Sequence, residues 1–235
     1  MSQPGQHHRA AYDAMRRAIL DARLYGILDL GYVAEKFAEE MATRLVVAGV
    51  QVLQLRAKHF SPDGLLPLAR SIATICRSHQ VPFILNDYPE LVSAVGADGV
   101  HVGQDDLPVS EARRLAGSWA VVGKSTHSVE QATAAAGEGA DYIGYGPLFS
   151  TPTKPDYTPV GLESVRLVED TIEVPVFCIG GIKRENLAEV MAAGARRVVI
   201  VSGLLQAEDV AGMVVSCRNL LGIPARDKEG SAADD

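Results

Sequence analysis

Two aspartates in the middle of the sequence carry its clearest chemical signal. Asp87 follows the apolar run 82–85 with Asn86 beside it, and Asp106 follows the apolar run 99–102. Carboxylate oxygens are hard ligands that suit Mg2+, which proteins commonly hold through one or two carboxylates while water and a substrate phosphate fill the other positions. If the two runs are neighbouring strands, the pair predicts a magnesium site.

Cationic and hydroxyl side chains occupy comparable positions after other apolar runs. Gln54, Arg56 and Lys58 alternate, so their side chains can face one way. Ser125 adds a neutral hydrogen-bonding group, and Lys154 adds a further cation from the longest loop. This set fits a diphosphate, because such a ligand needs both a divalent ion and a clamp of cationic side chains. The alternative is a network of surface ion pairs that binds no ligand.

The elements that position these residues alternate along the chain. Short β-branched or Leu-rich runs typical of strands occur at 24–30, 51–55, 82–85, 99–102, 120–122, 142–145, 175–179 and 197–201. Amphipathic stretches typical of helices occur at 33–48, 62–79, 88–95, 109–116, 129–138, 161–171, 184–193 and 207–220. This strict alternation indicates parallel βαβ units, and eight of them predict an α/β fold, a closed (β/α)8 TIM barrel.

The alternative architecture is an open doubly wound sheet. Such a sheet would be expected to carry a Gly-rich dinucleotide loop after its first strand, and residues 29–32 read only DLGY. We therefore expect one barrel domain over residues 24–222. Residues 1–23 are expected to form a helical extension, and residues 223–235 a disordered tail.

The charge and the apolar pattern exclude several classes of partner. The chain of 235 residues has 22 basic and 29 acidic side chains, a formal net charge of -7, whereas a nucleic-acid binder is expected to carry a basic surplus. No apolar run reaches the roughly 18 residues of a membrane-spanning helix. The N-terminus lacks the apolar segment of a secretory signal. Three cysteines without CxxC spacing, Cys76, Cys178 and Cys217, indicate reduced packing residues in a cytoplasmic protein.

The last two predicted strand ends point to a second anion site. A glycine pair ending in Gly181 follows the seventh run, and Val201 and Ser202 lie at the end of the eighth. TIM barrels frequently bind a phosphate there, where glycine lets backbone N–H groups approach the ligand. Thr151 and Thr153 could add hydroxyls, although tight turns alone would also explain the glycines. A diphosphate site beside a monophosphate site suggests an enzyme that joins two phosphorylated substrates.

Other catalytic patterns are weak or missing from the sequence. Only His101 and His127 lie near the predicted barrel mouth, and a histidine at a strand end is commonly a packing residue or a support for a neighbouring group. Asp106 and Ser202 also suit helix N-caps. The chain has no GxSxG elbow, HExxH pair or GxxxxGKS loop, which argues against serine hydrolases, zinc peptidases and P-loop proteins.

Several segments together resemble the thiamine phosphate synthase family. They are ND at 86–87, GADGVHVGQDDLP at 96–108, STHS at 125–128, GADYIG at 139–144, GPLF at 146–149, TPTKP at 151–155 and IGGI at 179–182. The resemblance runs from about residue 24 to residue 210. Its most specific part is the TPTK loop, because a generic barrel has no reason to carry it in register with QLRxK, ND and GQDD.

The resemblance implies a fold, a reaction and its participants. Members of the family are (β/α)8 barrels that condense 4-amino-2-methyl-5-(diphosphooxymethyl)pyrimidine with a thiazole phosphate, carboxylated or not, to give thiamine monophosphate and pyrophosphate. The implied mechanism is dissociative: pyrophosphate leaves, a pyrimidine-methyl cation forms, and the thiazole nitrogen captures it. Mg2+ is the implied cofactor and the two small molecules are the implied partners, while the oligomeric state stays open.

The resemblance also implies roles for individual residues. The pyrimidine diphosphate would be held by Gln54, Arg56, Lys58, Asn86, Ser125 and Lys154. The residues expected to act in catalysis are Arg56, Lys58, Ser125 and Lys154. Mg2+ would be bound by Asp87 and Asp106. The thiazole phosphate would be held by Thr151, Thr153, Gly181, Val201 and Ser202.

Two positions depart from the family pattern, and two other functions stay open. Asp29 follows a leucine where a threonine is more usual, and Lys124 replaces a small apolar residue, so the roles of both are undecided. A related thiazole tautomerase would move a proton through a histidine, here His127, and would have little use for Arg56 or Asp87. A regulator would bind a thiazole phosphate without releasing pyrophosphate.

Overall fold

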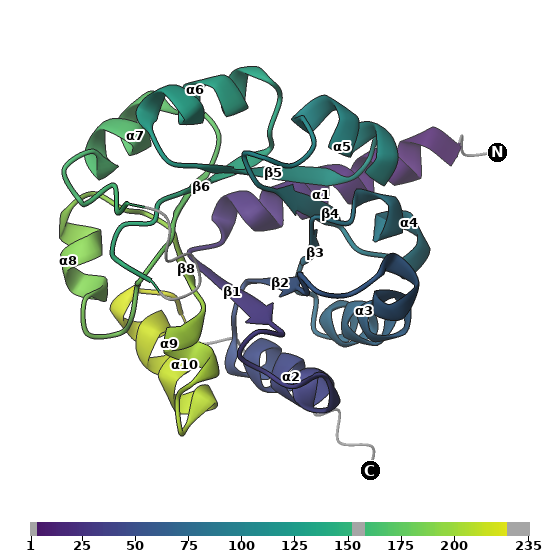
Figure 1. The fold of residues 1–235 in the computed structure, drawn as a ribbon, viewed down its shortest axis with the longest axis horizontal. Coiled ribbons are helices and arrows are strands. Elements are labelled where there is room, and N and C mark those ends of the chain that lie inside the picture. Colours follow the sequence, from purple (N-terminus) through teal and green to yellow (C-terminus); the bar gives the residue numbers. More distant parts are fainter. Residues whose placement is uncertain (1–3, 152–157, 225–235) are drawn as a thin grey trace, which may run out of the picture.

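Eight parallel strands form a closed ring at the centre of the molecule (Figure 1). The computed structural model describes residues 4–151 and 158–224. The strands are β1 (Leu24–Asp29), β2 (Val52–Arg56), β3 (Phe83–Asn86), β4 (Gly99–Val102), β5 (Val121–Thr126), β6 (Tyr142–Tyr145), β7 (Val176–Cys178) and β8 (Val198–Ile200). Each strand pairs with the next, and β8 pairs with β1, which closes the sheet. The predicted (β/α)8 barrel is confirmed.

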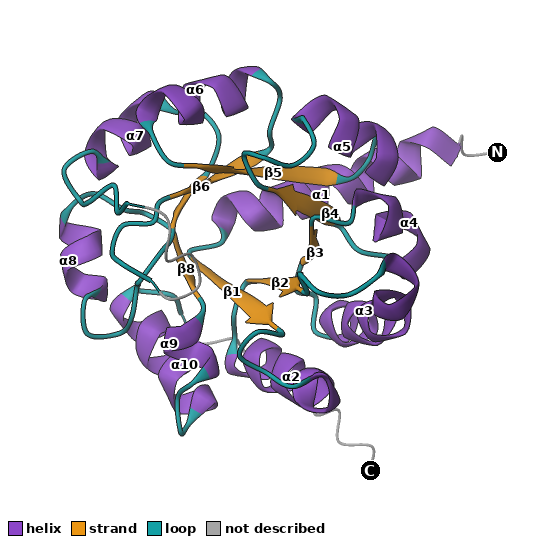
Figure 2. Cartoon of the chain, in the orientation of Figure 1, coloured by secondary structure: helices purple, strands orange, loops and turns teal. Residues whose placement is uncertain are grey.

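Helices surround the strand ring, and one further helix crosses one of its ends (Figure 2). In chain order they are α1 (Pro4–Asp21), η1 (Glu35–Phe37), α2 (Ala38–Ala48), α3 (Pro62–Ser78), η2 (Pro89–Leu91), α4 (Val92–Val95), α5 (Val109–Ala116), α6 (Val129–Gly137), α7 (Val165–Thr171), α8 (Leu187–Ala192), α9 (Ser202–Leu205) and α10 (Val210–Leu220), where η marks a 3-10 helix. Each crossover between consecutive strands therefore contains a helix, as parallel pairing requires.

Several element boundaries differ from the sequence prediction, and two of these differences have a clear cause. β5 continues to Thr126, because its ladder with β6 extends to the pair Thr126–Tyr145 although its last residues are polar. The helix predicted over 207–220 begins only at Val210, where the Asp209 side chain caps it, and the short helix α9 precedes it. Polar residues that pair or cap thus moved these boundaries, which an apolar pattern does not register.

Side chains alternate along the strands and so build two apolar layers. On β1, Leu24 and Leu28 are buried in an outer layer that includes helix residues, whereas Tyr25 and Ile27 join an inner layer with Phe177 of β7. The inner layer fills the ring with side chains, so the barrel is a packed core. This layer also closes the bottom of the cavity at the carboxyl ends of the strands, where Ile27 and Val199 line it.

Helix α1 crosses the end of the barrel at which the strands begin (Figure 1). Ile19 and the following Ala22 are buried in the inner layer, and Tyr12 packs against it. The Arg197 guanidinium, directly before β8, donates hydrogen bonds of 3.2 and 3.0 Å to the carbonyl of Leu20. The segment before β1 is therefore a helix that covers the barrel bottom, opposite the predicted site.

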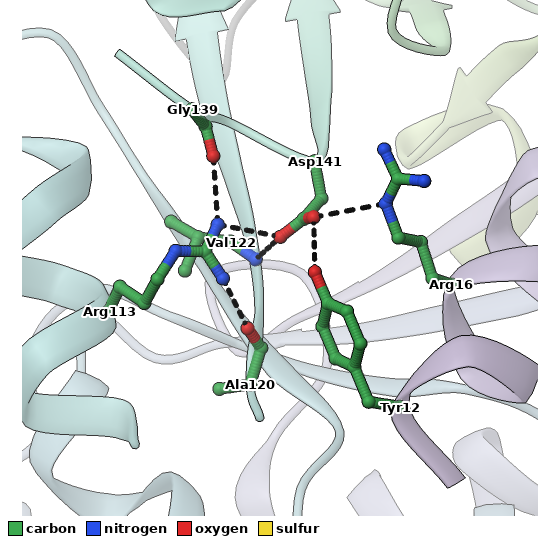
Figure 3. Close-up of polar contacts among 7 residues, drawn as sticks. All are labelled: Tyr12, Arg16, Arg113, Ala120, Val122, Gly139 and Asp141. Atoms are coloured by element: carbon green, nitrogen blue, oxygen red, sulfur yellow. Dashed lines mark hydrogen bonds and ion pairs between the residues drawn. The ribbon is translucent and has the colours of Figure 1, made fainter. Parts of the chain in front are cut away.

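A buried carboxylate ties α1 to the barrel wall (Figure 3). Asp141, directly before β6, accepts hydrogen bonds from the Tyr12 hydroxyl at 2.6 Å and from Arg16 Nε at 3.2 Å. Its other oxygen accepts from Arg113 Nη2 at 2.8 Å and from the backbone N–H of Val122 at 2.9 Å. One negative charge thereby connects α1, α5 and the two neighbouring strands.

The C-terminal end of the described chain adds to the core. Ile223, which we predicted to open a disordered tail, is buried in the outer layer, and its N–H donates to the Arg218 carbonyl at 2.9 Å. Residues 225–235 of that predicted tail lie outside the described residues. The three cysteines are buried and free, as expected for packing residues. Across residues 4–151 and 158–224, no helix combines the length and apolar character needed to span a membrane.

We expect Asp141→Asn to lower the free energy of unfolding by about 2–4 kcal/mol, because it leaves two partly buried cations, the buried Val122 N–H and the Tyr12 hydroxyl without their anion. The matched control is Asp170→Asn, since Asp170 pairs with Arg196 but is 56% exposed, and this change should cost less than about 1 kcal/mol. Urea denaturation of both variants checks this. Equal losses in the two variants would contradict the anchoring role of Asp141.

Candidate active site

One cavity opens at the end of the barrel where the strands finish, and most of the predicted site residues lie in its wall. Those that line it are Gln54, Arg56, Lys58, Asn86, Asp87, Asp106, Ser125, Thr151, Gly181, Val201 and Ser202. Thr153 and Lys154 lie outside the described residues, and their predicted contacts stay predictions. The cavity is thus built from residues spread over some 150 positions of the chain, which only the closed barrel brings to one rim.

Arg56 is oriented by Asp29, whose role the sequence left undecided. The two residues are opposite each other in the β1–β2 ladder, and Arg56 Nη1 donates to Asp29 Oδ2 at 2.7 Å. Asp29 is 2% exposed, and its other oxygen accepts from the N–H of Gly31 at 2.9 Å. A guanidinium has five N–H donors, so Arg56 keeps others for a ligand in the cavity. Asp29 therefore acts as a positioning residue.

Asp87 lies where the chain turns sharply after β3. Its backbone has a φ of 66°, which non-glycine residues seldom adopt, and its N–H donates to the His101 carbonyl at 3.0 Å. Its carboxylate forms an ion pair with Lys58, which extends from the end of β2 and is 41% exposed. Backbone strain of this kind concentrates at functional sites, because only a structure that fixes the residue firmly retains it.

Asp106 is presented by a loop after β4 that is anchored from behind. Its Oδ2 accepts from the N–H of Gly103 at 2.7 Å. Lys124 of β5 is 6% exposed, and its Nζ donates to the carbonyls of Gly103 at 2.7 Å and Leu107 at 3.4 Å. Lys124, whose role the sequence left undecided, thus braces the Asp106 loop from outside the strand ring.

The two carboxyl groups of the cavity shift each other's proton affinity. Burial raises the pKa of Asp87 above its ordinary value; Lys58 opposes this shift and Asp106 adds to it. Burial also acts to raise the pKa of Asp106, but hydrogen bonds with Asp87 and Gly103 and the charge of Lys58 outweigh it and hold that pKa below its ordinary value. Two adjacent carboxyl groups with opposite shifts mark a place where a cation would relieve repulsion.

The glycine pair after β7 brings backbone into the cavity wall. Gly180 and Gly181 have φ values of 97° and 67°, and a Cβ at position 181 would lie 2.7 Å from Phe149 Cβ. The Phe149 N–H donates to the Gly180 carbonyl at 3.0 Å, and Asn186 Nδ2 donates to the Gly181 carbonyl at 3.0 Å. Both positions thus require glycine, and the backbone of Gly181 lines the cavity together with Ser202.

Both histidines near the mouth contact residues of the site. His101 Nε2 lies 2.9 Å from Ser125 Oγ, and His101 Nδ1 lies 3.2 Å from the Tyr142 hydroxyl. His127 Nδ1 contacts the carbonyl of Gly146. His101 therefore supports a predicted ligand-binding side chain from the barrel interior.

Comparison with known sequences decides the family. The sequence pattern of thiamine monophosphate synthase matches residues 24–204. The chain belongs to the thiamine monophosphate synthase family. The thiamine-phosphate synthase of Chloroflexus aurantiacus is 40% identical over 206 residues, which is 87% of this chain and 95% of that protein. The thiamine-phosphate synthase of Thermus thermophilus is 46% identical over 167 residues, 71% of this chain and 80% of that protein. The predicted family and enzyme are confirmed.

Solved structures agree with this assignment. Thiamine phosphate pyrophosphorylase from Pyrococcus furiosus is 29% identical, with a TM-score of 0.80 over 88% of this chain and 98% of that chain. A 3-hexulose-6-phosphate synthase superposes with a TM-score of 0.63 at 18% identity, over 84% of this chain and 99% of that chain. The second likeness shows the barrel fold alone.

Three residues that hold cavity residues or their loops in place were not predicted from the sequence. It left Asp29 and Lys124 undecided, and it assigned nothing to Gln104, whose amide donates to the Ser125 carbonyl. A charged residue within an apolar strand, such as Asp29, was the available signal, because burial of a charge requires a partner. Which partner it has depends on the β1–β2 register, and that register is not readable from spacing.

We expect Asp29→Asn to weaken binding of inorganic pyrophosphate in the presence of Mg2+ about tenfold, because Arg56 loses the charge that orients it. Titration calorimetry measures the affinity. Glu40→Gln is the control, since it removes an exposed ion pair with Arg44, and neither residue lines the cavity. Unchanged pyrophosphate affinity in Asp29→Asn would contradict the positioning role.

Proposed function

We propose that this chain condenses 4-amino-2-methyl-5-(diphosphooxymethyl)pyrimidine with a thiazole phosphate to form thiamine monophosphate and pyrophosphate. The family membership supports the product, and one observation supports the substrates: a single cavity joins a carboxylate-and-cation wall to a glycine wall. The first wall suits a diphosphate and the second suits a monophosphate. The cytoplasmic location expected from the cysteines stays a prediction.

The diphosphate wall is formed by neighbouring strand ends. Arg56 is the last residue of β2, and Lys58 lies two residues beyond it. Asn86 is the last residue of β3, and Asp87 follows it directly. A guanidinium binds phosphate oxygens in a bidentate manner, while an ammonium acts as a point charge. These residues would grip the leaving diphosphate while the ring lies deeper in the barrel. Lys154 is proposed to add charge from the long loop.

The residues of the cavity fit Mg2+. Asp87 and Asp106 supply hard oxygen donors from adjacent strand ends, close enough to perturb each other. No cluster of three or more His, Cys, Asp or Glu side chains that could hold a metal occurs in the described parts of the chain, and an ion held by two carboxylates leaves places for water and substrate oxygens. When bound there, Mg2+ would neutralise charge on the diphosphate.

The chain's own part in the reaction is electrostatic and positional. The carbon–oxygen bond to the diphosphate breaks first, and Arg56, Lys58 and Lys154 stabilise the negative charge that gathers on the leaving group. Gln54 and Ser125 hold the pyrimidine ring as its methylene carbon becomes cationic. The backbone of Gly181 and the residue Ser202 hold the thiazole phosphate. This places the thiazole ring nitrogen where it can form the new carbon–nitrogen bond. Nothing in this scheme requires an activated nucleophile.

The alternatives that the sequence left open lose support from the site. A tautomerase would move a proton through a histidine and would release no pyrophosphate. The diphosphate wall would serve no purpose in such an enzyme, or in a regulator that binds only a thiazole phosphate. Pyrophosphate release separates the synthase from both alternatives, and turnover of the thiazole phosphate alone separates the tautomerase from the regulator.

The decisive experiment is incubation of the purified chain with both substrates. We expect thiamine monophosphate and pyrophosphate to form in equal amounts with Mg2+, and EDTA to reduce the rate at least about 100-fold, with recovery on adding excess Mg2+. Chromatography of the products measures this. Product formation from the thiazole phosphate alone would favour a tautomerase, and binding without pyrophosphate release would favour a regulator.

Substitution of the carboxylates tests the proposed metal site. Asp87→Asn and Asp106→Asn should each lower kcat at least about 100-fold, because each removes charge from the donor pair. Asp105→Asn is the matched control: Asp105 is an exposed neighbour of Asp106, and its loss should change kcat less than about twofold. Steady-state rates at several Mg2+ concentrations check this. Wild-type rates in both cavity variants would refute the site.

A further inference from the structure

A continuous chain of hydrogen bonds runs beneath the cavity from Gln54 to Ser125. Gln54 Nε2 donates to the Tyr25 hydroxyl at 2.9 Å, and that hydroxyl lies 3.0 Å from the hydroxyl of Tyr142. The Tyr142 hydroxyl lies 3.2 Å from His101 Nδ1, and His101 Nε2 lies 2.9 Å from Ser125 Oγ. The chain links side chains from β2, β1, β6, β4 and β5 across the barrel interior.

The members of this chain are held rigidly. Gln54 is 2% exposed, and Tyr25 and Tyr142 are each 1% exposed. Both tyrosine rings pack edge-on against Phe177, with ring centroids 5.3 and 5.6 Å apart. A Cβ at position 123 would lie 2.2 Å from Tyr142 Cζ and 2.6 Å from His101 Nδ1, so a glycine there makes room for their contact.

The order of donors along the chain follows from the number of protons that each group carries. The Tyr25 oxygen accepts from Gln54, so its single proton points to Tyr142, whose own proton then points to His101 Nδ1. A neutral imidazole has one donor and one acceptor nitrogen, so His101 Nε2 donates to Ser125 Oγ. The hydroxyl proton of Ser125 and the amide oxygen of Gln54 are left for the cavity, which both residues line.

Both tyrosine hydroxyls keep the proton that this order of donors requires. Burial raises the pKa of Tyr25 and of Tyr142 well above that of a free phenol. Both therefore stay protonated at neutral pH. Each hydroxyl then has one proton to give, and the direction of one link determines the direction of the next.

We propose that Tyr25, Tyr142 and His101 form a positioning relay, which fixes Gln54 as an acceptor and Ser125 as a donor, and that this polarity selects a 4-aminopyrimidine over a 4-oxopyrimidine ring. The selection rests on the proposed function for its ligand. An aminopyrimidine offers an amino donor beside a ring-nitrogen acceptor, which complements the pair. The 4-oxo ring has a carbonyl acceptor beside a ring N–H donor, the reverse pattern.

Reversal of the relay would be costly because all its links must change together. Gln54 would have to turn its amide, both tyrosines would have to redirect their protons, and His101 would have to change tautomer. Binding of the wrong ring without reversal leaves two buried polar pairs unsatisfied, and sites that hydrogen-bond a substrate reject such analogues strongly. A cut in the middle of the relay should let each end adjust separately.

Tyr142→Phe cuts the relay without touching either end. In the wild type we expect kcat/KM for the 4-amino diphosphate to exceed that for the 4-oxo diphosphate at least about 100-fold, and Tyr142→Phe to reduce this ratio about tenfold. Tyr145→Phe is the matched control on the same strand, because it removes a buried hydroxyl that contacts Ser164 at 2.7 Å outside the cavity. The ratio is insensitive to loss of folded protein. An unchanged ratio in Tyr142→Phe would overturn the relay.

The tautomer of His101 gives a readout that does not depend on the proposed reaction. Two-dimensional NMR of the ring nitrogens should show the Nε2–H tautomer in the wild type and in Tyr145→Phe, and a mixture of both tautomers in Tyr142→Phe. A protonated Nδ1 in the wild type would overturn the relay even if the enzyme were active. Failure of the wild type to use either pyrimidine, with the Nε2–H tautomer present, would overturn the substrate selection and the proposed function while leaving the relay in place.

Discussion

The closure of β8 onto β1 is the constraint on which the rest of the structure depends. In a closed parallel barrel every strand ends on the same rim, so residues that follow different strands converge there however far apart they are in sequence. Arg56 and Ser202 are separated by about 150 positions and still line one cavity. An open sheet with the same strands would place its edge strands far apart, and the two proposed anion walls would not share a substrate-sized space.

The two ends of the barrel divide stability from chemistry. At the bottom, the Asp141 carboxylate accepts four hydrogen bonds from α1, α5 and β5, which occupy both of its oxygens. At the top, Asp87 and Asp106 face each other with opposite pKa shifts, and Asp87 has a left-handed backbone. A carboxylate is held in place when its hydrogen-bond partners saturate it, and it can bind a ligand when they do not.

Between these ends lies a layer that is both core and site. The side chains of Tyr25 and Tyr142 pack with Phe177 as core residues do, yet their hydroxyls connect Gln54 with His101, which contacts Ser125. Similarly, Lys124 is buried outside the ring and braces the Asp106 loop by donating to its carbonyls. Such supports matter because recognition requires that polar groups hold one orientation, and packing alone does not set the direction of a hydrogen bond.

The sequence by itself determined the barrel, the family and many of the residues that line the cavity. Short apolar runs alternating with helical stretches leave few other folds, and short motifs such as ND and GQDD can be recognised without knowing how the loops fold. Only the tertiary structure decided the pairing of Asp29 with Arg56, the direction of Lys124 and the path from Gln54 to His101. These depend on strand register and on distances across the ring, which join residues remote in sequence and leave no periodic trace.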